Sequence, residues 1–442
     1  MTRSRAYTTL TCVLLASRVA YGQRQPPAPL TAALRGAAVD SVRQALLTYY
    51  VFPDTATAMA AYLDARTKAG AFDTLTNPNA LANAITRELR RAHEDRHLRV
   101  VYDPEEAARA ADTTHREAQE AVARDRRANF YFRDARILPG NIGYLEFRQF
   151  ADTSVDARKT VQAAMRFVAN ADALIIDLRD NRGGSAAMAG EIMSYFVNGR
   201  VHWSDSYSRL TGKWTEGWME NRPAITGGIY LGMPLTVLTS SWTFSAAEGM
   251  AYTLKYGRGA RIVGQATAGG AHALRRVALG NGFVGFIPYA RSANVVTKTD
   301  WEGTGVAPDI SADPPHAPLR AQEAIFGERM AAAKDSLAIR AIEWAINEAR
   351  SVALDVDVPV AMLRDYAGRF EEYTFSVRDN SLYSENSSRN GKTDKLNAIT
   401  PTLFQIDWES QVEFVRDATG AVSNIHIYWN DGWVDTIARG KQ

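Results

Sequence analysis

Apolar residues recur at three- and four-residue spacing through the first third of the chain. Residues 30–52 and 77–98 both show this pattern, which is typical of helices that bury one face. Asn77 and Pro78 mark the start of the second helix, because Asn caps helices and Pro is favoured in a first turn. We therefore expect a mostly helical subdomain over residues 30–135.

The pattern changes at about residue 136, where short apolar runs begin to alternate with helical segments. Strands are predicted within 141–150, 172–181, 234–241 and 260–267, and helices within 155–170, 186–196 and 246–257. Strands that alternate with helices indicate a largely parallel α/β core, assigned here to residues 136–315. In such sheets, functional sites gather beyond the carboxyl ends of the strands.

The last part of the chain has a different character. Residues 316–355 predict a linker followed by one long amphipathic helix. Residues 356–442 alternate apolar and polar positions, with Asn-Gly and Asp-Gly pairs that are typical of hairpin turns. This segment predicts a small antiparallel β-domain.

The N-terminus has the layout of a secretory signal over residues 1–22. Arg3 and Arg5 precede an apolar run, and small residues lie just before a cleavage point after Gly22. The run is too short to span a bilayer, so we expect export, to the periplasm or the medium, without stable membrane insertion. The alternative is a buried N-terminal helix. Cys12, the only cysteine, lies in this segment, so the mature chain would lack disulfides and thiolate chemistry.

Composition narrows the function classes. The chain has 442 residues, of which 46% are hydrophobic and 23% charged, with a formal net charge of +2. These values describe a soluble globular protein of two or three domains. The sequence has no long one-sided basic block, so nucleic acid is not an expected partner, since phosphate binding needs a concentrated basic surface.

Two loops that follow predicted strands carry residues suited to acyl transfer. Gly183 and Gly184 lie between a strand and a helix, where glycine lets backbone N–H groups approach a ligand closely. Ser245 lies at the start of the next helix, where the Ala246 N–H could face an oxyanion. A tight turn explains the two glycines equally well, and a simple helix cap explains the serine equally well.

A serine nucleophile needs a base, and a base is usually oriented by a carboxylate. His97 ends a helix and enters a short strand, and Glu302 lies in a glycine-flanked loop. Each also has an ordinary alternative: a hydrogen-bonded structural histidine and a solvated loop carboxylate.

Four segments together resemble a known family. They are IIDLRDNRGG, VLTSSWTFSAAE, RIVGQATAGGAH and DWEGTGVAPDI, in this order. Over residues 35–315 the chain resembles the tail-specific, or C-terminal-processing, serine peptidases, in the branch of the tricorn core and the interphotoreceptor retinoid-binding protein repeats. The resemblance implies an α/β fold: a crotonase/Clp-protease-like spiral βα core with an N-terminal helical subdomain and a C-terminal antiparallel β-domain. It implies no cofactor and no metal.

The resemblance also implies roles for individual residues. The nucleophile falls on Ser245, and the oxyanion hole on the Ala246 N–H with one N–H from Gly183 or Gly184. The lysine base of the processing proteases falls on Gly270, so a Ser–Lys pair is not expected.

The base of the tricorn-like branch falls on His97, in the segment Asp95-Arg96-His97, where Arg96 replaces the family's glycine. The acidic partner falls on Glu302. Glu248 is given a minor accessory role: it could form a hydrogen bond nearby, or simply pair with a base such as Lys255. His272 is expected to be structural.

We therefore expect an exported serine peptidase that cleaves polypeptides or peptides through an acyl-enzyme. The usual substrate-tethering PDZ domain has no place in the sequence. Two alternatives stay open: a non-catalytic protein that binds hydrophobic ligands on the same fold, and a hydrolase of non-peptide esters or amides.

Overall fold

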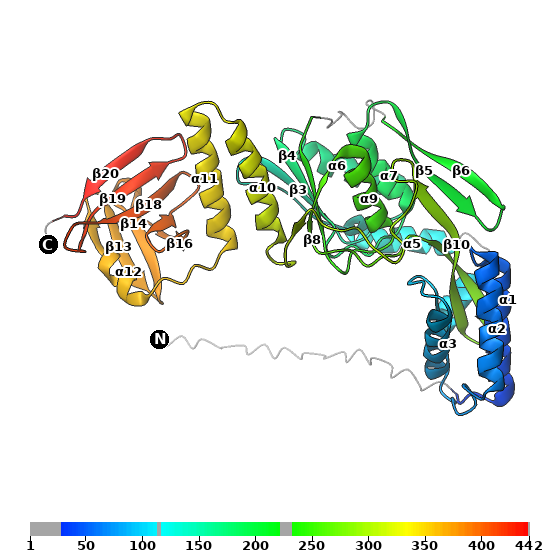
Figure 1. Ribbon diagram of the computed structural model, residues 1–442. Coiled ribbons are helices and arrows are strands. Elements are labelled where there is room, and N and C mark those ends of the chain that lie inside the picture. Colours follow the sequence, from blue (N-terminus) through cyan, green and yellow to red (C-terminus); the bar gives the residue numbers. More distant parts are fainter. Residues whose placement is uncertain (1–27, 113–115, 222–231, 441–442) are drawn as a thin grey trace, which may run out of the picture.

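The computed structural model describes residues 28–112, 116–221 and 232–440, and Figure 1 shows its three parts in a row. The helical N-terminal part, the α/β core and the C-terminal sheets follow one another along the molecule. The predicted signal segment, 1–22, lies outside the described residues. Within them, no helix is both long and apolar enough to cross a membrane.

The N-terminal part consists of helices packed on one end of a sheet. The helices are α1 (Ala32–Tyr49), α2 (Pro53–Lys68), α3 (Pro78–Ala92) and α4 (Pro104–Ala111). The next helix, α5 (Arg116–Arg127), lies alongside the core (Figure 1) and contacts the turn at residues 129–131. As predicted, α3 begins at Pro78, and the Asn77 side chain accepts hydrogen bonds from the N–H groups of Asn79 and Ala80. His97 lies between α3 and the strand β1 (Arg99–Tyr102).

The core contains a six-stranded sheet in the order β11-β8-β7-β4-β3-β2. Its strands are β2 (Phe132–Leu138), β3 (Ile142–Phe147), β4 (Ala173–Asp177), β7 (Leu235–Thr239), β8 (Arg261–Gly264) and β11 (Ile310–Ser311). β2 pairs antiparallel with β3, and the other pairings are parallel. This arrangement confirms the predicted α/β class.

Helices cover both faces of this sheet, as the alternation of side chains along β4 shows. Leu174 and Ile176 pack in one cluster with α6 (Val155–Phe167), α7 (Ala186–Met193) and α9 (Ala246–Arg258). Ala173 and Ile175 pack in another cluster with α10 (Ala317–Ala332) and α11 (Ser336–Ala353). Because both faces are buried, β4 and β7 read as continuous apolar runs.

A second, antiparallel sheet joins the helical part to the core, and the sequence pattern did not predict most of it. Its strands are β1, β5 (Arg200–Ser208), β6 (Lys213–Glu220), β9 (Ala273–Gly280) and β10 (Phe283–Asn294). One end of β10 pairs with β1 and the other with β5. β6 and β9 are mostly exposed and carry many charges, so they lack the apolar runs that signal buried strands.

The C-terminal domain has its own core and two antiparallel sheets. One sheet holds β12 (Gly368–Phe370), β13 (Tyr373–Arg378), β14 (Ser381–Asn386) and β15 (Lys392–Lys395), and the short helix α12 (Val360–Tyr366) precedes it. The other holds β16 (Asn397–Ala398), β17 (Leu403–Gln405), β18 (Ser410–Arg416), β19 (Val422–Trp429) and β20 (Val434–Ala438). These sheets confirm the predicted antiparallel β-domain.

The prediction of one long helix before this domain was wrong. The segment forms two helices, α10 and α11, with a break at Ala333–Asp335. Ala333 leaves the helical conformation at ψ 133°, and the Asp335 side chain accepts a hydrogen bond from the Ala338 N–H at the start of α11. A short break between two apolar periods is easily read as one helix, because the period continues on both sides.

Candidate active site

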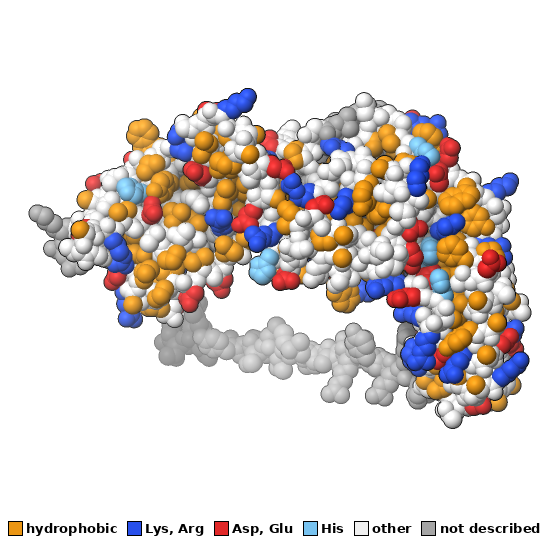
Figure 2. Space-filling model, viewed as in Figure 1, with side chains coloured by type: hydrophobic (Ala, Val, Ile, Leu, Met, Phe, Trp, Pro, Cys, Tyr) orange, Lys and Arg blue, Asp and Glu red, His pale blue; other side chains and the backbone are white. Residues whose placement is uncertain are grey.

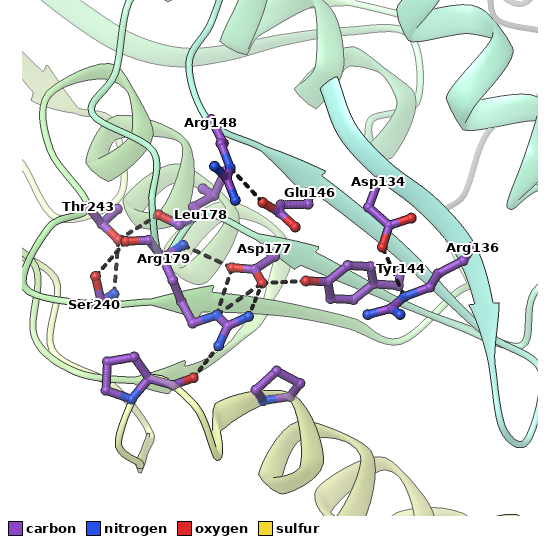
Figure 3. Close-up of polar contacts among 12 residues, drawn as sticks. Asp134, Arg136, Tyr144, Glu146, Arg148, Asp177, Leu178, Arg179, Ser240 and Thr243 are labelled. Atoms are coloured by element: carbon purple, nitrogen blue, oxygen red, sulfur yellow. Dashed lines mark hydrogen bonds and ion pairs between the residues drawn. The ribbon is translucent and has the colours of Figure 1, made fainter. Parts of the chain in front are cut away.

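The carboxyl ends of β4 and β7 bring two loops together. The strands pair in parallel, with Asp177 opposite Leu238, so residues 178–184 and 240–245 leave the sheet side by side. The Thr243 hydroxyl donates a hydrogen bond to the Leu178 carbonyl at 2.7 Å, and the Ser240 hydroxyl donates to the Arg179 carbonyl at 2.5 Å (Figure 3). These two hydroxyls therefore hold the loops to each other.

A buried ion pair anchors the first loop to the sheet. Asp177 is 2% exposed, and its carboxylate accepts hydrogen bonds from the Tyr144 hydroxyl at 2.5 Å and the Arg179 guanidinium at 3.0 Å (Figure 3). Arg179 also donates to the Pro314 carbonyl. Burial, reinforced by the Asp177 charge, raises the pKa of Tyr144, so the phenol stays a donor. The loop thus leaves β4 from a fixed position.

Ser245 has a strained backbone at the start of α9. Its φ of 57° and ψ of −123° lie outside the regions that serine ordinarily adopts. Gly183 lies directly against it: a Cβ on Gly183 would be 2.8 Å from the Ser245 Cβ and 2.9 Å from the Ala246 nitrogen. Only glycine allows this close approach, and strain of this kind is concentrated at functional sites.

The contacts of the two glycines narrow the prediction for the oxyanion hole. The Gly183 N–H donates to the Asn181 side chain at 2.8 Å, so it is already used. Among the described residues, neither the Gly184 N–H nor the Ala246 N–H has a hydrogen-bond acceptor. The available pair is therefore Gly184 and Ala246, and Gly183 contributes by having no side chain.

Glu248 has a larger role than the sequence indicated. Its side chain is fully buried and accepts hydrogen bonds from the Ser245 N–H (2.8 Å), the Thr267 hydroxyl (2.6 Å), the Gly269 N–H (2.6 Å) and the Gly270 N–H (2.9 Å). Burial raises the pKa of Glu248, and these four donors oppose that shift. The carboxylate therefore joins the turn at Ser245 to the loop 267–270. The predicted alternative, a pair with Lys255, was wrong, because Lys255 pairs with Asp309 at 2.7 Å.

His97 lies against the residue that precedes Ser245. Its ring is 4.4 Å from the Phe244 ring, centroid to centroid, and is 2% exposed. A Cβ on Gly270 would lie 2.8 Å from the His97 Cε1 and 2.2 Å from the Phe244 Cε2. The His97 and Phe244 rings thus fill the space that the side chain of any other residue at position 270 would need. This is the position at which the processing-protease branch is expected to carry its lysine.

Burial controls the ionisation of His97. Burial, helped by the charges of His272 and Arg99 and opposed by that of Asp95, lowers its pKa to about 4. Within the described part of the chain, the buried Nδ1 atom of its ring has no hydrogen-bond partner. The imidazole is therefore neutral at pH 7, which is the state that a proton acceptor needs.

Glu302 lies near His272, and within the described part of the chain it makes no hydrogen bond to His97. Its Oε2 atom accepts from the Ala271 N–H at 2.5 Å and lies 3.6 Å from the His272 Nδ1. His272 Nδ1 is in turn 2.8 Å from the Asp95 Oδ2. The structure thus gathers Asp95, His272 and Glu302. His272 was expected to be structural, but its contacts with Asp95 and Glu302 were not predicted from the sequence.

One atom each of Asp95, His272 and Glu302 lies within 4.8 Å of the others, a span that a metal ion could bridge. All three atoms already have partners within the protein: the imidazole, the Asp95 carboxylate and the Ala271 N–H. We therefore interpret the group as an ion-pair cluster.

We predict that Glu248→Gln destabilises the protein, because an amide NH₂ would replace one acceptor oxygen and face donors. Losing two of four buried hydrogen bonds should lower the free energy of unfolding by roughly 2–3 kcal/mol, measured by urea denaturation. The control is Glu328→Gln, which breaks an exposed ion pair with Arg261. This substitution should change the free energy of unfolding by less than about 1 kcal/mol. Equal effects of the two substitutions would contradict the assigned role of Glu248.

Comparison with known proteins identifies the family. Residues 141–312 match peptidase family S41, and residues 30–130 match the N-terminal domain of peptidase S41 in eukaryotic IRBP. The first region contains Gly183, Gly184 and Ser245, and the second contains His97.

Solved structures show distant likeness only. A lipoprotein from Streptococcus agalactiae is 16% identical, with a TM-score of 0.44, 69% of this chain covered and 98% of that one. The photosystem II D1 C-terminal processing protease is 16% identical (TM-score 0.42, 64% and 94% covered). The tricorn protease is 13% identical (TM-score 0.39, 72% and 37% covered). The assignment therefore rests on the two family matches: the chain has a peptidase family S41 domain over residues 141–312, preceded by the S41 N-terminal domain over residues 30–130.

Proposed function

We propose that this protein is an exported serine peptidase in which Ser245 is the nucleophile and His97 the general base. The family supports a peptidase in general, and polypeptide as its substrate. The observation that carries the finer proposal is the packing around Gly270. The His97 and Phe244 rings lie in the space beside this glycine, next to the strained Ser245. A neutral histidine is thus brought to the serine turn from a different subdomain.

The proposed reaction assigns one step to each of these groups. The Ser245 Oγ attacks the carbonyl carbon while its proton moves to the His97 ring, and the carbonyl oxygen becomes an oxyanion held by the Gly184 and Ala246 N–H groups. Collapse of this intermediate breaks the C–N bond, and the proton passes from His97 to the leaving amine. Water then attacks the acyl carbon and gives a proton to His97. The bond between this carbon and the Ser245 Oγ breaks, His97 returns the proton to the Oγ, and the acid leaves.

Glu302 is proposed as the acidic member of the site. Its carboxylate holds the Ala271 N–H, so it fixes the loop that begins at Gly270 and borders the His97 ring. It also faces His272, which connects it to Asp95. In this arrangement, Glu302 acts on His97 through the cluster and not through a direct hydrogen bond.

A groove beside the oxyanion turn could receive the substrate chain. It has a volume of about 290 Å³ and follows one face of α7, which begins two residues after Gly184. Small residues of α7 and aromatic residues of β5 and β6 line it, and so do charged side chains: Ala186, Ala187, Gly190, Trp203, Trp218, Met219, Glu191, Arg200 and Glu220. Small residues facing aromatic ones leave room for a bulky apolar side chain of a peptide.

Export is the remaining part of the proposal. It rests on the N-terminal sequence alone, with Arg3 and Arg5 ahead of an apolar run and a cleavage point after Gly22. Charged side chains of both signs are interspersed over the face of the molecule shown in Figure 2. This mixed charge suits a protein that works free in solution.

The direct test is covalent labelling of the protein with a fluorophosphonate, followed by mass spectrometry of the labelled peptide. We expect a label on Ser245 that is lost in Ser245→Ala and reduced at least about 10³-fold in His97→Gln, with a smaller loss in Glu302→Gln. The control is Ser241→Ala, which changes an exposed hydroxyl in the same loop. A folded wild-type protein that takes no label would contradict the proposal and favour a binding protein. Cleavage of esters but not of peptides would favour a hydrolase of non-peptide esters or amides.

The pH dependence of labelling follows from the lowered pKa of His97. Because the base must be neutral, the labelling rate should rise with pH to half its maximum near pH 4 and stay level through neutrality. The unfolded chain binds a proton at this histidine below about pH 6.5. Stability should therefore fall as pH decreases from about 6.5 to 4. Half-maximal labelling near pH 6.5 would mean that the imidazole is solvated, contrary to the structure.

The groove is tested by Gly190→Leu. A Cβ on Gly190 meets no atom within 4 Å, and leucine favours helices over glycine by about 1 kcal/mol, so the fold should be kept. The added side chain should raise KM for peptides with bulky apolar residues about tenfold without changing fluorophosphonate labelling. Gly327→Leu in α10, where a Cβ is also unobstructed, is the control. An unchanged KM would remove this groove from the substrate path.

A further inference from the structure

A second buried histidine lies next to the proposed base. The His272 side chain is 4% exposed, and its Nδ1 atom lies 2.8 Å from the Asp95 Oδ2 and 3.6 Å from the Glu302 Oε2. Asp95 is fully buried. The His272 ring also makes a T-shaped contact with the Phe52 ring, with centroids 5.5 Å apart. The ring is therefore fixed by packing as well as by charge.

The cluster joins three distant parts of the chain. Asp95 lies between α3 and β1, in the helical part of the molecule. His272 directly precedes β9, and Glu302 lies in the loop between β10 and β11. The Tyr50 hydroxyl, from the end of α1, donates to the Asp95 Oδ2 at 3.0 Å. A single imidazole thus links the N-terminal subdomain to two loops of the core.

The charges of the cluster favour a protonated ring. Burial opposes the charge of His272, but the hydrogen bond to Asp95 and the charge of Glu302 outweigh it and raise its pKa. Asp95 is affected in the opposite sense: burial opposes its ionisation, and the bonds from His272 and Tyr50 hold its pKa below the usual range. The titratable groups around the His272 ring are Asp95, Glu302, Asp300, His97 and Tyr50.

Asp95 connects this cluster to the proposed base. Its Oδ1 accepts the backbone N–H of His97 at 3.0 Å, while its Oδ2 is held by His272. The two oxygens of one buried carboxylate therefore serve two histidines, and a shift of Asp95 moves the turn that carries His97. Gly270, which borders the His97 ring, is only two residues from His272.

We propose that His272 is a positioning residue for the hydrolysis: by bridging Asp95 and Glu302, it sets the turn of His97 against the loop 269–272 and so places the base next to Ser245. This inference rests on the proposed function. His272 does not exchange a proton with the substrate; it holds the group that does.

The test compares two substitutions at this position. His272→Asn keeps a side-chain donor close to where Nδ1 lies, whereas His272→Phe keeps a flat ring of similar size without the donor or the charge. We expect His272→Phe to lower the rate of Ser245 labelling and kcat about 10- to 100-fold, with little change in KM. His272→Asn should restore most of the loss. The control is His202→Phe. His202 forms a half-exposed pair with Asp205, in which the nitrogen–oxygen distance is 2.8 Å, as it is between His272 and Asp95.

A second readout separates positioning from simple damage and does not depend on activity. The imidazolium of His272 lowers the pKa of His97, so in folded His272→Phe the His97 pKa, followed by NMR, should rise from about 4. Suppose that the wild type is labelled at Ser245 and that His272→Phe changes neither the labelling rate nor the His97 pKa. That result would overturn the role of His272 and leave the proposed function standing. If the wild type takes no label, the proposed function fails, and the NMR titration still decides whether His272 controls the state of His97.

Discussion

The buried carboxylate of Glu248 is the interaction on which the geometry of the site depends. It holds the N–H of Ser245, at the start of α9, and the N–H groups of Gly269 and Gly270, in the loop that faces His97. A fully buried charge is tolerable only when its acceptor capacity is filled, so these segments have little freedom to move apart. The strained conformation of Ser245 persists because the surrounding hydrogen bonds determine it.

Close backbone approach is the second constraint, and glycine meets it at two places. Gly183 brings the turn after β4 against Ser245, and Gly270 leaves space for the rings of His97 and Phe244. The proposed base comes from the N-terminal subdomain, whereas the proposed nucleophile and N–H donors come from the core. Asp95, His272 and Glu302 form contacts between these two parts. This division explains why a buried ion cluster lies beside the reacting groups.

The sequence was informative where function depends on local structure. The apolar runs of β4 and β7 and the glycine pair at 183–184 are local features, and Ser245 directly precedes a recognisable helix. The position of His97 came from a motif resemblance, and the family matches now cover the same regions. The catalytic roles of Ser245, His97 and Glu302 are predictions that labelling of the variants tests.

The features that sequence reasoning missed depend on long-range contacts. The four donors to Glu248 lie at 245 and 267–270, and the residue spacing gives no sign that they converge; only the Ser-x-x-Glu spacing of a capping box offered a hint. The role of His272 is set by Asp95, which is 177 residues away. In the second sheet, β6 and β9 were missed because their exposed, charged residues resemble polar segments.

The most direct measurement is the crystal structure of the protein after reaction with a peptidyl phosphonate. We predict a covalent bond to the Ser245 Oγ, with the phosphonyl oxygen about 2.7–3.1 Å from the Gly184 and Ala246 nitrogens and the His97 ring within hydrogen-bond distance of the adduct. A phosphonyl oxygen turned away from both N–H groups, or an adduct on another residue, would contradict this prediction.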